Sequence, residues 1–257
     1  MKKPTFRQLT VTSTEQISPN MQRIIFHGEG LSEFPENCEG SYIKLLFNQS
    51  GETNLASLEE GARPAMRTYT IRQFSKQQRS ITVDFVRHLT QDLQCGFAAR
   101  WAINAKVGDT INIAGPGAIT DINTDVDWFF MVADMTALPA LSAKVCALPS
   151  DAKGYAVIQV TSLDDIQNLQ VPSSLTVTWV TEQDSLIETV RNQPWLDGSV
   201  SVWAACEFDS MRAMRTYFRN EKSVERENIY LSSYWKKGVT EDGHKVLKKE
   251  DADKHDG

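Results

Sequence analysis

The sequence lacks the features that mark a secreted, membrane-spanning or metal-binding protein. Four cysteines and four histidines are scattered along 257 residues, with no paired spacing that would bind zinc or an iron–sulfur cluster. No run of about 18 apolar residues is present, and the first six residues lead into polar ones instead of the apolar segment of a signal peptide. We therefore expect a cytoplasmic protein with reduced thiols, no resident metal and no membrane insertion.

An excess of positive charge is also missing. The chain has 27 lysines and arginines against 33 aspartates and glutamates, a net charge of −6. Binding to the backbone of DNA or RNA needs clustered cations, so no nucleic-acid partner is expected. What is present is the composition of a folded protein, with 41% hydrophobic and 23% charged residues. The length allows one large domain or two ordinary ones.

The first half of the chain has the pattern of an antiparallel β domain. Apolar residues recur with a period of two, which is typical of half-buried strands, over residues 5–14, 21–27, 42–47, 67–74, 80–88 and 109–114. An alanine-rich segment, residues 96–105, interrupts them and predicts a helix. Six strands and one helix indicate a six-stranded Greek-key β-barrel.

The second half changes to an α/β pattern. Residues 128–133 form a continuous apolar run, as in a strand that is buried on both faces. Further strands at 155–160, 176–180, 200–205 and 229–232 alternate with helical segments at 139–148, 185–192 and 210–219. This alternation indicates a doubly wound, mainly parallel sheet. We predict domains at 1–124 and 125–238, followed by a charged tail, 239–257, with a frayed end.

Two segments of the first half carry residues suited to binding a ligand. In Arg67-Thr68-Tyr69-Thr70-Ile71-Arg72, period two places Arg67 and Tyr69 on one face of a strand, where a cation and an aromatic ring can bind a planar heterocycle. Gly96-Phe97-Ala98 opens the predicted helix, whose first N–H groups can bind a pyrophosphate, with Arg100 as a further partner. Each segment taken alone is equally compatible with an ordinary barrel strand and an ordinary turn into a helix.

Together these segments resemble the siderophore-interacting protein family of flavin-dependent ferric-siderophore reductases, a branch of the ferredoxin–NADP reductase superfamily. The resemblance spans nearly the whole chain and depends on the order and spacing of its motifs. The matching segments are residues 67–72, 83–88, 96–102, 107–116, 134–140, 202–207, 212–217 and 234–238.

The resemblance implies non-covalently bound FAD and outer-sphere electron transfer that needs no catalytic side chain. It places Tyr69 at the isoalloxazine, and Arg67 and the helix start at the pyrophosphate. The implied cofactor contacts are Arg67, Thr68, Tyr69, Thr70, Asp84, Val86, His88, Gly96, Phe97, Ala98, Ala99, Thr136, Ala137 and Trp235. Phe97 departs from the family, in which proline is common at this position.

The electron donor stays open between NADH, NADPH and reduced ferredoxin. The superfamily begins the first helix of its nicotinamide domain with a glycine-rich turn, whereas residues 133–137 contain no glycine. Glu207 adds a carboxylate where a glycine often follows the fourth strand. Both features favour weak dinucleotide binding and a small protein donor. The neighbouring Cys206 is expected to be a buried structural thiol.

A ferric siderophore is too large for a buried pocket, so we expect it to bind a shallow basic recess. The residues proposed for this recess are Arg87, His88, Lys236, Lys237 and Lys245, although the more distal lysines of the tail fit an ordinary solvated face better. Two other functions are compatible with the sequence. One is a flavin- or siderophore-binding carrier without turnover, and the other is a reductase of the same fold that acts on a quinone or on free flavin.

Overall fold

The computed structural model describes residues 6–58, 61–87, 96–118 and 120–255. The chain divides into two compact units, residues 1–119 and 120–257. Within the described ranges, no helix is long and apolar enough to cross a membrane.

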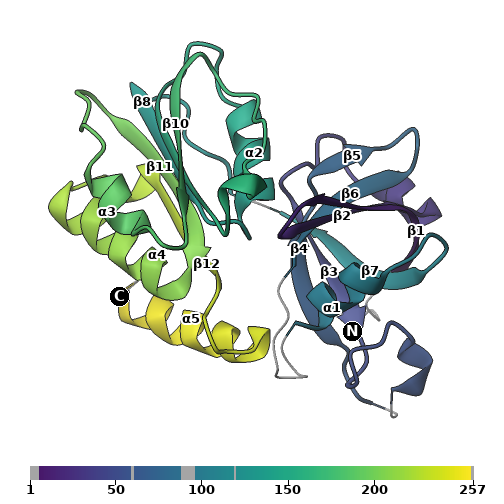
Figure 1. Ribbon diagram of the computed structural model, residues 1–257. Coiled ribbons are helices and arrows are strands. Elements are labelled where there is room, and N and C mark those ends of the chain that lie inside the picture. The colour runs from purple at the N-terminus through teal and green to yellow at the C-terminus, as the bar shows by residue number, and fades with distance from the viewer. Residues whose placement is uncertain (1–5, 59–60, 88–95, 119, 256–257) are drawn as a thin grey trace. The chain divides into compact units, whose positions relative to one another are not determined.

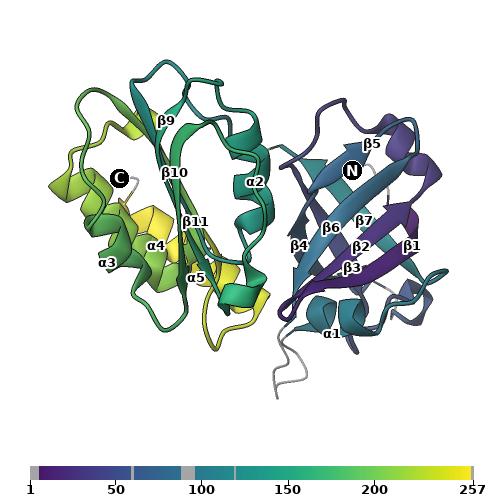
Figure 2. The same cartoon turned by 45° about the horizontal axis from the view of Figure 1, so that its top comes forward.

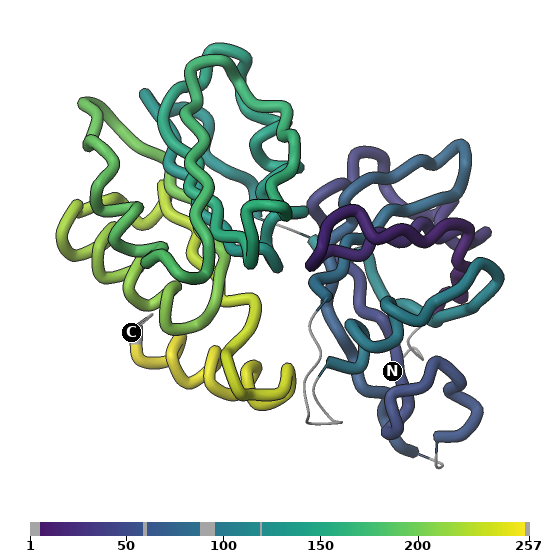
Figure 3. Tube along the Cα trace, viewed as in Figure 1, coloured from purple at the N-terminus to yellow at the C-terminus, as the bar shows by residue number. Residues whose placement is uncertain are grey.

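The first unit is built on an antiparallel sheet with the strand order β4-β3-β7-β1-β2-β6-β5 (Figure 1). Its strands are β1 (Arg7–Ser18), β2 (Met21–His27), β3 (Tyr42–Phe47), β4 (Ala65–Thr70), β5 (Gln73–Ser75), β6 (Ser80–Val86) and β7 (Thr110–Gly117). Figure 3 follows the chain through the β1–β2 hairpin, in purple, where the antiparallel pairing begins. The antiparallel β domain expected from the period-two pattern is thus present.

The two ends of this sheet meet, which makes it a barrel. Tyr69 of β4 and Phe85 of β6 have ring centroids 4.4 Å apart, although these strands stand near opposite ends of the strand order. Alternate residues of the strands point inward and form one apolar core: Leu9, Val11, Ile24, Phe26, Ile43, Leu45, Phe47, Ile81, Val83, Phe85, Ile111 and Ile113. The predicted helix, α1 (Phe97–Asn104), adds Phe97, Ala98 and Ala102 to this core.

The strand count differs from the prediction at residues 67–74, which form two strands instead of one. The N–H of Ile71 donates to the carbonyl of Ser41, whereas the N–H of Arg72 donates to the carbonyl of Thr82. The chain therefore leaves its partner β3 and joins β6 between two consecutive residues. The residues that face the core change phase here, from Tyr69 and Ile71 to Phe74, so the prediction of one continuous strand was wrong at this point.

The second unit is a five-stranded parallel sheet with the order β10-β9-β8-β11-β12. Its strands are β8 (Trp128–Ala133), β9 (Lys153–Val160), β10 (Ser174–Thr181), β11 (Val200–Glu207) and β12 (Ile229–Trp235). Helix α2 (Leu138–Cys146) covers one face, and α3 (Leu186–Arg191) and α4 (Phe208–Arg215) cover the other (Figures 1 and 2). The strand order reverses direction between β8 and β11, which is where doubly wound sheets bind ligands.

The segment predicted as a charged tail contains a further helix, α5 (Glu241–His255). Polar contacts hold it against the rest of the second unit. Lys248 donates to the hydroxyl of Ser232 at 2.8 Å, and Asp251 accepts from Arg215 at 2.6 Å. Leu247 also packs against the apolar core and His244 contacts the ring of Phe208, but these few contacts do not form the apolar stripe by which an amphipathic helix is recognised in a sequence.

A buried ion cluster ties two strands of the barrel together. Arg23 of β2 and Asp84 of β6 are paired across the sheet, and the guanidinium binds both carboxylate oxygens at 2.7 and 2.8 Å. Arg72 approaches the same carboxylate at 3.3 Å. The Asp84 side chain has no exposed surface. A buried carboxylate is tolerated only when it is paired in this way.

We expect Asp84→Ala to destabilise the protein by about 3 kcal/mol. Removing one partner of a buried pair leaves an uncompensated charge, which typically costs about 3–5 kcal/mol, and the low end applies because Arg23 is 26% exposed. Urea unfolding followed by circular dichroism measures the change. Glu33→Ala is the matched control, since Glu33 pairs with Arg7 but is 67% exposed, and should cost less than about 1 kcal/mol. Equal losses in the two variants would contradict this account.

Candidate functional site

The first part of the candidate site lies on strand β4. Arg67 is only 8% exposed, and its Nη1 donates to the carbonyl of Met66 at 2.9 Å. Tyr69, two residues further along the strand, is half-buried and packs on Phe85. Thr68 is exposed and Thr70 is buried. The strand thus presents a held guanidinium and a partly exposed aromatic ring, as the alternation of the sequence predicted.

Helix α1 supplies the second part of the site. Gly96 takes the left-handed conformation, with φ at +71°, and the helix begins at Phe97. Among the residues that the structure describes, no side chain caps this helix start, and its first turn contains no acidic residue. Ala98 and Ala99 are buried, so the helix packs closely against the barrel. Helix N-termini carry partial positive charge, and this one is suited to bind an anion.

Phe97 joins the two parts of the site. The Arg67 guanidinium lies 5.1 Å from the centroid of the Phe97 ring, and that of Arg100 lies 5.5 Å from it. Both distances are within the range of cation–π attraction. Three sources of positive charge, namely two guanidiniums and a helix start, therefore meet around one aromatic ring.

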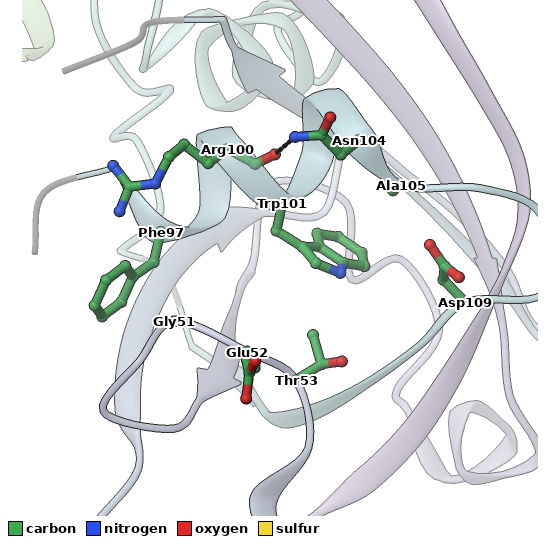
Figure 4. Close-up of a pocket in the computed structure, with 9 residues that line it drawn as sticks. All are labelled: Gly51, Glu52, Thr53, Phe97, Arg100, Trp101, Asn104, Ala105 and Asp109. Atoms are coloured by element: carbon green, nitrogen blue, oxygen red, sulfur yellow. Dashed lines mark hydrogen bonds between the residues drawn. The ribbon is translucent and has the colours of Figure 1, made fainter. Parts of the chain in front are cut away.

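A shallow pocket of about 350 Å³ runs along α1 (Figure 4). The Trp101 ring points into it from the helix, and Glu52 and Thr53 lie across from the helix. The pocket is lined by Gly51, Glu52, Thr53, Phe97, Arg100, Trp101, Asn104, Ala105 and Asp109. Sequence reasoning identified Phe97 and Arg100 but not the loop at 51–53, because contact between a helix and a distant loop leaves no local pattern.

Three predicted cofactor or substrate residues lie at the end of β6. Asp84 binds Arg23 and Arg72, a structural role that the sequence did not reveal. Val86 is half-buried, and Arg87 donates to the side-chain oxygen of Gln22 at 2.6 Å. His88 lies outside the described residues. The assignment of these residues to flavin or substrate stays a prediction.

In the second unit, a carboxylate of the chain itself binds the turn that leads into α2, while no side chain among the described residues caps the first turn of the helix. Asp134 follows β8, and its Oδ1 accepts from the N–H groups of Thr136 and Ala137 at 2.9 and 3.3 Å and from the Thr136 hydroxyl at 2.5 Å. Its Oδ2 accepts from the Trp235 indole at 2.7 Å. Burial raises the pKa of the Asp134 carboxyl, and these four hydrogen bonds oppose the rise.

A carboxylate of the chain also binds the start of α4. Glu207 ends β11, and its Oε2 accepts from the N–H groups of Asp209 and Ser210 at 2.6 and 3.3 Å. Its Oε1 accepts from the N–H of Lys237 at 3.2 Å. Because β8 and β11 are neighbours at the point where the strand order reverses, both helix starts at the usual ligand-binding edge of this sheet carry carboxylates.

Sequence reasoning missed the role of Asp134, although a signal for it exists. An aspartate whose side chain accepts from the N–H two residues further on forms an Asx turn, and Asp134 precedes Thr136 at this spacing, just ahead of a helix with proline in its first turn. Thr136, Ala137 and Trp235, which were predicted to contact the cofactor, all donate to this carboxylate. The indole of Trp235 remains 39% exposed.

The lysines predicted to bind substrate differ in their surroundings. Lys236 forms ion pairs with Asp209 and, at 3.5 Å, with Glu207. Lys237 is exposed, and Lys245 is exposed and pairs with Glu241 and Asp242 on its own helix at 3.4 and 3.2 Å. Pairing with two carboxylates offsets the charge of Lys236, which the sequence alone did not indicate.

The one thiol near these carboxylates is inert. Cys206 is fully buried, and burial raises the pKa of its thiol well above the usual value, as do Asp134 and Glu207 nearby. A protonated, inaccessible thiol is neither a nucleophile nor a metal ligand. Among the described residues, no three histidine, cysteine or acidic side chains come together to bind a metal ion.

Comparison with known proteins places these features in a family. Residues 10–120 match the siderophore-interacting FAD-binding domain, and residues 126–238 match the siderophore-interacting protein domain. The chain is 32% identical to the ferric vibriobactin reductase of Vibrio cholerae, with 93% of this chain and 92% of that protein covered. It is 24% identical to the NADPH-dependent ferric-chelate reductase of Escherichia coli, with coverage of 90% and 92%.

Solved structures agree with these matches. The siderophore-interacting protein SipS from Aeromonas hydrophila superposes with a TM-score of 0.84 at 30% identity, and the superposition covers 97% of this chain and 99% of that one. A ferredoxin–NADP⁺ reductase from Plasmodium falciparum, at 13% identity, a TM-score of 0.63 and coverage of 88% and 95%, shares the fold. The FAD-binding domain, the two-part fold and the full-length similarity together show that this chain belongs to the siderophore-interacting protein family.

Proposed function

We propose that the protein is an FAD-dependent reductase of ferric siderophores. The observation that carries the proposal is the contrast between its helix starts. The start of α1 has no side-chain cap among the described residues and meets two guanidiniums, whereas Glu207 caps the start of α4 and Asp134 binds the N–H groups just before α2. A diphosphate therefore fits α1, in the FAD-binding domain.

The residues of the first unit suit each part of the cofactor. Arg67 and the N–H groups that follow Gly96 bind the diphosphate, while Tyr69, with Thr68 and Thr70 beside it, borders the isoalloxazine. Val86 completes the lining among the described residues, and the role of His88 stays a prediction from the sequence. FAD supplies single electrons when it is bound, and the chain's own residues bind and orient it.

Reduction releases the iron by changing the preference of the ion for its ligands. One electron converts siderophore-bound Fe(III) to Fe(II), a softer ion of lower charge that hard oxygen ligands such as hydroxamates and catecholates hold less well. The siderophore itself is not cleaved, so no acid, base or nucleophile is needed. This agrees with a buried, protonated Cys206.

The first test is the reoxidation of reduced flavin. We expect FAD in the anaerobically photoreduced protein to be reoxidised within seconds of mixing with a ferric siderophore, with one Fe(II) trapped by ferrozine for each electron delivered. Stopped-flow absorbance measures both. The gallium complex of the same siderophore is the control, because it has the same shape and charge and is not reduced. Flavin that stays reduced with the iron complex would favour a carrier, and reoxidation by quinone alone would favour a quinone reductase.

The electron donor is an open choice between NAD(P)H and a reduced ferredoxin. The relative from E. coli is NADPH-dependent by name, which supports a dinucleotide. The carboxylates of Asp134 and Glu207 oppose tight binding, because a dinucleotide diphosphate would meet negative charge at both helix starts. We propose that NAD(P)H serves as a loosely bound donor and that ferredoxin competes with it.

We expect flavin reduction by NADPH to saturate only well above micromolar concentration. Glu207→Gln should lower that concentration several-fold, because it removes one negative charge and keeps an acceptor for the N–H groups of α4. Glu227→Gln, a change of the same kind at an exposed position, should leave it unchanged. The measurement is the observed rate of flavin reduction against NADPH concentration. Saturation at micromolar NADPH in the unaltered protein would overturn the argument.

The cations predicted to line the substrate recess differ in their ion pairs. Of the predicted cations, Lys237 is exposed, while Lys236 is paired with Glu207 and Asp209. We propose that Lys237 attracts anionic ferric siderophores, with Lys245 contributing, and that Lys236 mainly fixes the segment after β12. A role for Arg87 of the first unit stays a separate prediction.

We expect Lys237→Glu to slow reduction of an anionic ferric siderophore several-fold and to leave flavin content unchanged. Exposed charges are screened over about 8–10 Å at ordinary salt, so the rate of the unaltered protein should fall as ionic strength rises. The variant should lose most of that salt dependence. Lys153→Glu, at the exposed first residue of β9, is the control. A rate that ignores both salt and the Lys237 change would place the iron complex elsewhere.

A further inference from the structure

The Phe97 side chain is placed to act on two cations at once. Arg67 reaches the ring from β4, and Arg100 reaches it from one turn further along α1, with centroid distances of 5.1 and 5.5 Å. Figure 4 shows the Arg100 side chain extending back toward the first turn of α1, on the same side as the Phe97 ring. Two guanidiniums so close to one ring repel each other, and the negative face of the ring offsets part of that repulsion.

The ring itself has little freedom to move. It is only 7% exposed, and it packs against the ring of Phe47 with centroids 6.3 Å apart. On the side of the loop after β3, a Cβ added to Gly51 would lie 2.6 Å from Cδ1 of Phe97, well inside van der Waals contact. The backbone of Gly51, with φ at +81°, therefore closes directly over the ring. The barrel and the loop together fix the orientation of the Phe97 ring that both guanidiniums contact.

We propose that Phe97 is a positioning residue for FAD, whose ring holds Arg67 and Arg100 so that both guanidiniums bind the diphosphate at the start of α1. This inference rests on the proposed FAD site. It assigns Arg100 a direct role and gives the aromatic ring a function that a proline at the first helical position does not supply. Orienting long side chains in advance lowers the entropy lost when the ligand binds.

The test compares ligands with and without a diphosphate. Phe97→Leu keeps an apolar side chain against Phe47 and Gly51 but removes the ring. We expect its dissociation constant for FAD to rise about tenfold, which corresponds to about 1.4 kcal/mol, while that for riboflavin, which has no phosphate, changes less than twofold. ADP should compete with FAD about tenfold less well than in the unaltered protein. Quenching of flavin fluorescence in titrations of flavin-depleted protein measures all three.

Conservative and matched variants separate positioning from packing. Phe97→Tyr keeps the ring and should retain FAD affinity. Phe74→Leu, which removes a ring that packs on Phe34 at 6.1 Å, should leave it unchanged. Arg100→Ala should weaken FAD several-fold, and combined with Phe97→Leu it should add little, because both changes remove the same contact. Arg79→Ala, at an arginine paired with exposed Glu29, is the control.

The variants separate the role of Phe97 from the existence of the proposed FAD site. If Arg67→Ala binds FAD as well as the unaltered protein, the proposed FAD site is wrong. If Arg67→Ala loses FAD while Phe97→Leu and Arg100→Ala do not, the site stands and the role of Phe97 is overturned. Equal loss of FAD and riboflavin in Phe97→Leu would show that the ring only supports the fold. If that variant fails to fold, Phe97→Met, which also removes the ring and keeps an apolar side chain, takes its place in the same comparison of FAD with riboflavin.

Discussion

The backbone N–H groups at the start of a helix need an acceptor, and the way this need is met organises the whole chain. At α4 the chain meets it with Glu207, and just before α2 Asp134 accepts from the N–H groups of Thr136 and Ala137. At α1 the described residues provide no side-chain cap and add two guanidiniums. The two carboxylates thus disfavour a phosphate near α2 and α4, and the guanidiniums favour one at α1. This difference is why we propose that the first unit binds FAD and that the second binds a dinucleotide only loosely.

The fold was largely predictable because it depends on apolar periodicity. The inward residues of β1, β2 and β7 alternate, and β8 is apolar throughout, so each strand is visible in its own sequence. What escaped prediction depends on contacts between distant residues. The break between β4 and β5 comes from a change of hydrogen-bonding partner at Ile71 and Arg72. Helix α5 is held by polar contacts and by a few contacts of His244 and Leu247, which together form no periodic apolar pattern.

The site was predictable in its parts and less so in its connections. Arg67, Tyr69 and Gly96 were found from strand alternation and from the glycine before a helix. The ring contacts of Phe97 and the arginines on Asp84 join segments that are far apart in the chain, so spacing cannot reveal them. Lys236 shows the same limit for charge, since the sequence identifies the cation but not the two carboxylates that pair with it in the structure.

The tight fit of Gly51 against the Phe97 ring has a consequence for how this protein can change over time. A side chain at position 51 would displace the ring, and a smaller residue at position 97 would leave Gly51 covering an empty space. In either case Arg67 and Arg100 would lose the aromatic ring that they contact. During evolution, substitutions at these four positions should therefore occur together, and those at 51 and 97 should be accepted as pairs. Relatives that carry proline at position 97 should show larger residues at position 51.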